Sequence, residues 1–108
     1  MIFQTLDDAM AAMKAASETG ESIILQTTPD AIHYAGSLYI LDIFKKVRVA
    51  YPSVKAEFIF DCGDAGAEVI AAMQDGHKTI KSSAKPEIRA KLKSIAQQYG
   101  VNFIETAE

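Results

Sequence analysis

The segment AEFIFDCGDAGAEVIAAMQDG, residues 56–76, decides the fold. Its first six residues are apolar at their centre and predict a buried strand over 56–61. The Ala-rich run 65–75 places Val69, Ile70 and Met73 at helical spacing, and Gly76 is a typical helix stop. A strand that leads directly into a helix is the building unit of an α/β protein.

The same alternation continues on both sides of this segment. Apolar periodicity, with Gly and Pro as punctuation, predicts three further helices and three further strands: helices over 5–19, 35–50 and 84–99, and strands over 22–28, 78–82 and 101–105. One helix in every gap between strands requires crossover connections and therefore a parallel sheet.

We predict one α/β domain over residues 1–108, with a single-layer parallel sheet of four strands and helices on both faces. The two apolar strands, 22–28 and 56–61, should be central, and the more polar pair should lie at the edges. Numbered along the chain, the strands then take the order 3-2-1-4, as in one half of a doubly wound sheet. A fragment of a (β/α)8 barrel is the alternative, although a complete barrel needs about 250 residues.

Composition places the chain among ordinary globular domains. Hydrophobic residues make up 49% and charged residues 23% of the 108 residues, which excludes a disordered tail or a disulfide scaffold. The longest apolar run, 35–44, is too short for the ~20 residues of a membrane span, so we expect no membrane partner. The N-terminus shows no secretory signal, and Cys62 is the one cysteine, so we expect a cytoplasmic protein.

Charge is unevenly distributed along the chain. The net charge of −3 divides into −5 over residues 1–42, +4 over 43–93 and −2 over 94–108. A net-acidic chain is a poor match to a general nucleic-acid-binding protein. We therefore do not expect nucleic acid as a partner.

Polar residues follow every predicted strand, at the sheet end where α/β proteins bind their ligands. Asp61, Cys62 and His33 are candidate catalytic residues, as a carboxylate base or nucleophile and as a thiol with an imidazole base. The candidate ligand-binding residues lie in the same loops and carry hydroxyl or charged side chains: Thr28, Asp64, Ser82, Ser83 and Lys85. The 82–85 loop in particular suits a small phosphate or carboxylate.

Each candidate also has a structural interpretation. Asp61 can accept N–H groups of its own turn, Asp64 and Ser83 can each cap a helix, and Cys62 can be a buried apolar residue. His33, Asp61, Cys62 and Asp64 carry atoms that ligate zinc, but they lack the spacing of a metal motif. We expect neither a metal nor another cofactor.

The D-C-G-D-x-G segment at 61–66 resembles small uncharacterised bacterial α/β proteins, in which such a strand end leads into an Ala-rich helix. The Ala35-Gly36 pair before the longest helix and Pro52 after it are similar as well. The resemblance implies an α/β fold and a site at this strand end, and it carries no activity.

We therefore expect a non-catalytic module that binds a partner, a second copy of itself or a small ligand. The alternative is a small enzyme or an anionic-ligand-binding protein that uses Asp61 and the 82–85 loop. The broad apolar face of helix 35–50 favours a homodimer with Tyr39, Ile43 or Val47 in its interface.

Overall fold

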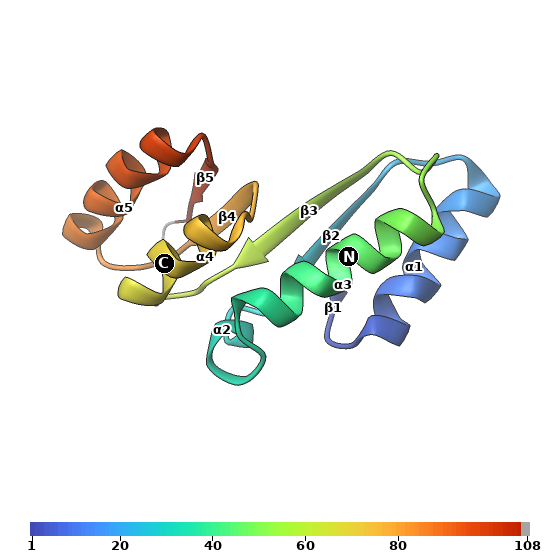
Figure 1. Ribbon diagram of the computed structural model, residues 1–108, viewed down its shortest axis with the longest axis horizontal. Coiled ribbons are helices and arrows are strands. Elements are labelled where there is room, and N and C mark those ends of the chain that lie inside the picture. The colour runs from blue at the N-terminus through green and yellow to red at the C-terminus, as the bar shows by residue number, and fades with distance from the viewer. Residues whose placement is uncertain (107–108) are drawn as a thin grey trace.

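The computed structural model describes residues 1–106 and alternates strands with helices throughout (Figure 1). The strands are β1 (Ile2–Phe3), β2 (Ile23–Thr27), β3 (Ala56–Asp61), β4 (Thr79–Ser82) and β5 (Asn102–Glu105). The helices are α1 (Leu6–Thr19), α2 (Ala31–Tyr34), α3 (Ser37–Ala50), α4 (Ala67–Asp75) and α5 (Pro86–Tyr99). The predicted α/β class is confirmed.

The five strands are all parallel and follow one another across the sheet in chain order, β1-β2-β3-β4-β5. The predicted count of four strands and the order 3-2-1-4 are therefore wrong. The additional strand, β1, has two residues and no periodicity of its own. Backbone bonds hold it in place: the amino group of Met1 donates to Ile24 O at 2.8 Å, and Gln26 N donates to Met1 O at 3.0 Å.

The four long helices form one layer, in which α1 contacts α3, α3 contacts α4, and α4 contacts α5. Right-handed crossovers between neighbouring strands, always stepping in the same direction, place every helix on the same face. The expected helices on both faces are therefore wrong. This sequential order is the strand order of a (β/α)8 barrel, the alternative left open by the sequence.

The core lies between the sheet and this helix layer. Fully buried Leu25, Phe60 and Ile80 of the sheet meet Val47 and Val69 of the helices there. Ile43 is 2% exposed and Val47 is fully buried, so two of the three residues expected in a dimer interface are not accessible to a second copy. Tyr39 is exposed, because it lies on the outer side of α3.

The sheet is staggered around β3, which Figure 1 shows as the strand that joins the two ends of an elongated molecule of 43 × 25 × 25 Å. The first part of β3 pairs with β2, and its last residues, Phe60 and Asp61, pair with β4. Within residues 1–106, no helix has the length and apolar character needed to cross a membrane.

Candidate functional site

The loops after β2, β3 and β4 meet at the carboxyl end of the sheet, as the sequence predicted. Ser83 N donates to Gly63 O at 2.8 Å, which joins the loops after β4 and β3. Gly63 has φ +56°, and a Cβ atom there would lie 2.6 Å from Pro29 O, so the loop after β2 also closes on it. Only glycine accepts both this backbone conformation and this close approach.

Asp61 is hydrogen-bonded within its own turn and to β2. Its side chain is almost fully buried, and Oδ1 accepts the N–H of Gly63 at 3.0 Å. Its main chain bonds to the hydroxyl of Thr27 on β2, which accepts from Asp61 N at 2.9 Å and donates to Asp61 O at 3.3 Å. The carboxylate therefore holds the turn that follows β3.

Asp64 does not cap helix α4, so the prediction that it does is wrong. Helix α4 begins at Ala67 with Gly66 in the N-cap position and no side-chain capping bond. Asp64 precedes the helix by three residues, and its exposed side chain lies at the edge of a surface hollow.

Cys62 and His33 do not form a nucleophile and its base. Cys62 is fully buried, and burial, with smaller contributions from Asp61 and Glu68, raises the pKa of its thiol to about 12. A thiol with that pKa stays protonated near neutral pH and is a poor nucleophile. His33 lies exposed on the short helix α2.

The hydroxyl groups at this end act largely within their own loops. The buried Ser82 Oγ accepts the N–H of Ala84 at 3.2 Å, and Thr28 Oγ1 lies 3.0 Å from Tyr34 Oη. Lys85 occupies the N-cap position of α5, so the prediction that Ser83 caps this helix is wrong. Pro86 at the first helical position fixes where α5 begins.

One hollow, of about 660 Å³, lies between the loop after β3 and the start of α5. It brings together three candidates from the sequence, Asp64, Ser83 and Lys85, with Arg89. Thr28, Asp61 and Ser82 are not among the residues that line it. The remaining lining residues are Ala84, Pro86 and Ile88.

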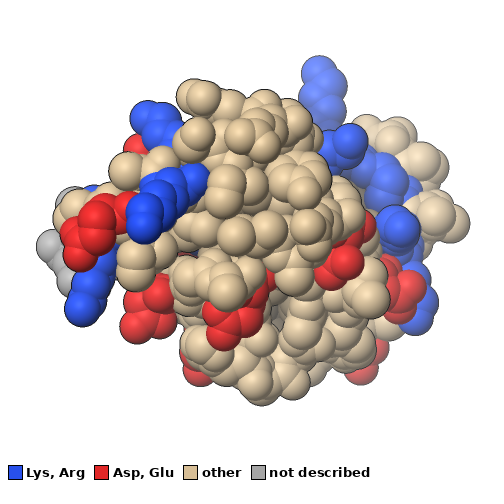
Figure 2. All heavy atoms as spheres, turned by 60° about the vertical axis from the view of Figure 1, so that its left-hand side comes forward, with Lys and Arg blue, Asp and Glu red and all other residues tan. Residues whose placement is uncertain are grey.

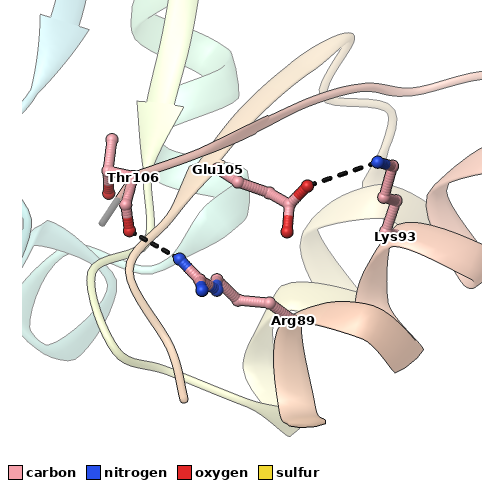
Figure 3. Close-up of polar contacts among 4 residues, drawn as sticks. All are labelled: Arg89, Lys93, Glu105 and Thr106. Carbon is pink, nitrogen blue, oxygen red and sulfur yellow. Dashed lines mark hydrogen bonds and ion pairs between the residues drawn. The ribbon is translucent and has the colours of Figure 1, made fainter. Parts of the chain in front are cut away.

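Arg89 is the site residue that the sequence analysis missed. Its Nη1 donates to Thr106 O at 2.7 Å, and Lys93 Nζ, one helical turn further, lies 3.3 Å from Glu105 Oε2 (Figure 3). The Nε atom of Arg89 is buried and has no hydrogen-bond partner within residues 1–106. Its signal in the sequence was the spacing of four residues from Lys85, which places both side chains on one side of a helix.

A second hollow, of about 420 Å³, lies between α3, β3 and the start of β4. Three cations line it: Lys45, Arg48 and Lys78. Arg48 is engaged, because it donates to Val54 O at 2.7 Å and to Ala56 O at 2.9 Å and lies over the ring of Phe58. We interpret this hollow as part of the packing around β3.

Charge on the α5 side of the molecule is local (Figure 2). In that view the Lys and Arg side chains form separate groups around a wide uncharged area, with acidic side chains among them.

Across residues 1–106, no group of three or more His, Cys, Asp and Glu side chains is placed to hold a metal ion.

Comparison with known proteins gives a distant similarity. No family model matches the chain. A fructose-bisphosphate aldolase from Nostoc sp. (strain PCC 7120 / SAG 25.82 / UTEX 2576) is 27% identical over 97 residues. The match covers 90% of this chain, and the chain spans 27% of the aldolase.

Proposed function

We propose that this chain is a binding module whose carboxyl-end hollow takes a small anion, with phosphate as its simplest form. The observation that carries the proposal is that Lys85 and Arg89 line one hollow, with a buried Nε of Arg89 that has no hydrogen-bond partner within residues 1–106. Guanidinium groups bind phosphate and carboxylate oxygens through paired N–H donors. The bond to Thr106 O fixes the guanidinium before any ligand arrives.

The charges of the hollow predict modest affinity. Lys85 and Arg89 contribute two positive charges, and Asp64 contributes one negative charge. The net field is positive, which favours an anion, but the carboxylate reduces its strength. Removal of the Asp64 charge should therefore tighten anion binding.

Binding without catalysis agrees with the state of the candidate catalytic residues. Asp61 is engaged in its turn, the Cys62 thiol is protonated near neutral pH, and His33 lies exposed on α2. None of the three lines the hollow.

An enzyme that acts on a sugar bisphosphate is the second candidate, and the similarity to the aldolase favours it. The name of that relative gives a substrate with two phosphate groups, which agrees with an anion site in this chain. Since the chain spans 27% of the aldolase, the shared property that we propose is phosphate binding and not cleavage.

Calorimetric titration with inorganic phosphate tests the proposal. Each charged contact contributes roughly 1.5–3 kcal/mol, so Lys85→Ala and Arg89→Lys should each weaken binding about tenfold or more. Lys91→Ala is the matched control, because Lys91 is an exposed lysine of the same helix that does not line the hollow. Asp64→Asn should strengthen binding.

The proposal fails if phosphate does not bind, or if Lys91→Ala weakens binding as much as Lys85→Ala. An assay of fructose bisphosphate cleavage separates the two candidates. Turnover by the purified chain, lost in Asp61→Asn, would favour the enzyme.

We also propose that the protein is cytoplasmic. The buried thiol of Cys62 supports this location, since a single protected cysteine suits a reducing compartment. We propose in addition that the chain associates as a dimer and that it is related to the small bacterial α/β proteins that share D-C-G-D-x-G. The separate basic groups of Figure 2 agree with a partner other than nucleic acid.

A further inference from the structure

One face of the sheet is left uncovered by the helix layer. Side chains alternate along each strand, and the residues that turn away from the helices include Ile2, Ile24, Ile59 and Ile104. Ile2 is 57% and Ile24 is 48% exposed, while Ile59 is buried but lies outside the hydrophobic core cluster. Parallel sheets are normally covered on both faces, and within residues 1–106 no helix covers this one.

Within residues 1–106 the sheet has two free edges, formed by β1 and β5, and these two strands run in the same direction. The N–H groups of Asn102 and Thr106 donate to Lys78 O and Ser82 O on the β4 side. By alternation, the intervening Phe103 and Glu105 turn their N–H groups towards the outer edge of β5. The outer edge of β1 is the other end of the strand order.

A second copy can complete both features at once. A two-fold rotation about an axis parallel to the strands keeps every strand in the same direction. It brings β5 of one copy beside β1 of the other at two equivalent junctions, and it turns the two uncovered faces towards each other. Such a closed pair leaves no free strand edge, which is how barrels avoid edge-to-edge aggregation.

The helices beside these edges have complementary charge. Helix α1, which contacts β1, carries Asp7, Asp8 and Glu18 against Lys14, a net charge of −2. Helix α5, which contacts β5, carries Arg89, Lys91 and Lys93 against Glu87, and Lys93 pairs with Glu105 of β5, which leaves a net charge of +1 beside this edge. At each junction of the closed pair, a basic α5 therefore approaches an acidic α1.

We propose that two copies of this chain associate through β1 and β5 into a closed pair with the uncovered sheet faces inside. This inference rests on the proposed self-association and assigns its surface. That surface is distinct from the exposed side of α3.

Light scattering of the purified chain and of two matched variants tests both the self-association and the surface assigned to it. Wild type should give twice the chain mass of 11.7 kDa at micromolar concentration. Ile24→Glu places a charge inside the pair and should give a folded monomer, with folding checked by circular dichroism. Val49→Glu makes the same change on α3, at a residue 79% exposed, and should leave the dimer intact.

Cross-linking then locates the junction. The double variant Ile2→Cys with Ile104→Cys carries one thiol beside each edge on the uncovered face, while Cys62 is fully buried. A short bis-maleimide should give covalent dimer in the double variant and little in either single variant, because the junction joins β1 to β5.

The outcomes separate the two proposals. A wild-type monomer would overturn both self-association and the closed pair. A dimer that persists in Ile24→Glu, dissociates in Val49→Glu, or cross-links equally in the single variants would overturn the assigned surface alone.

Discussion

The hydroxyl of Thr27 makes two hydrogen bonds to the main chain of Asp61, accepting from its N–H at 2.9 Å and donating to its carbonyl at 3.3 Å. Both residues are buried, so the bonds form away from water. They join the ends of β2 and β3 at the point where the loops of the carboxyl end begin. A side chain thus takes the place of a backbone ladder bond there.

Thr27→Val should destabilise the protein by about 1–3 kcal/mol, because it leaves the buried N–H of Asp61 without an acceptor. Thr27→Ser keeps the hydroxyl and should cost less than Thr27→Val. Urea unfolding of the three proteins measures the difference. A Val variant as stable as wild type would show that the hydroxyl does not hold the strand ends together.

Gly63→Ala should destabilise the protein more than an ordinary glycine substitution. Its φ of +56° is unfavourable for alanine, and the added Cβ would lie 2.6 Å from Pro29 O, a backbone atom. Gly20→Ala is the control, since Gly20 has φ +75° but no atom within 4 Å of the added Cβ. The control should cost about 1–2 kcal/mol from backbone strain alone.

Gly63→Ala should exceed that control by about 1–3 kcal/mol, the usual cost of overpacking. Thermal or urea unfolding provides the comparison. Equal destabilisation by the two variants would mean that the loops after β2 and β3 have room to move apart.

His77 should make the stability of the protein fall in mild acid. Burial lowers the pKa of this side chain below 6.5, and a hydrogen bond of 2.8 Å from Nε2 to Ser37 O only partly opposes the shift. Below pH 6.5 the unfolded chain therefore takes up a proton that the folded chain resists. The free energy of unfolding should fall with pH from there down to the lower folded pKa, by at most about 1.4 kcal/mol per pH unit.

The second histidine supplies the control for this effect. His33 lies exposed on α2, so His33→Gln should keep the pH dependence of wild type. His77→Gln should flatten it between pH 7.5 and 5.5, even if the variant is less stable throughout. An unchanged slope in His77→Gln would assign the pH dependence to other groups.

The four long helices and most strands could be predicted from the sequence, because their signals are local, whereas the short helix α2 was expected to be a loop. Helix α4 ends before Gly76 as expected. The φ of Gly76 is +112°, a conformation that favours glycine, so the residue type itself indicates the helix end. Strand β1 escaped prediction because two residues carry no period. The strand order depends on which edges meet across the chain, and apolar content did not distinguish a central strand from its neighbours.

The arrangement of the loops at the carboxyl end could be predicted in part for the same reason. The meeting of three loops follows from parallel strands, and it is observed. Which residue caps a helix depends on the first helical residue, and α4 and α5 begin two residues later than predicted. Arg89 lines the hollow because it lies four residues after Lys85 and because it bonds to Thr106 O. The bond to Thr106 joins distant parts of the chain, so the sequence did not predict it.

The most direct test of the proposed anion site is a two-dimensional NMR titration of the ¹⁵N-labelled chain with inorganic phosphate. The account predicts saturable shifts of the amide signals of residues 83–85 and 87–89, together with the side-chain Nε–H signal of Arg89. The shifts should be lost in Lys85→Ala and retained in Lys91→Ala. Shifts that do not saturate, or that centre on Arg48 and the second hollow, would contradict the assignment of this site.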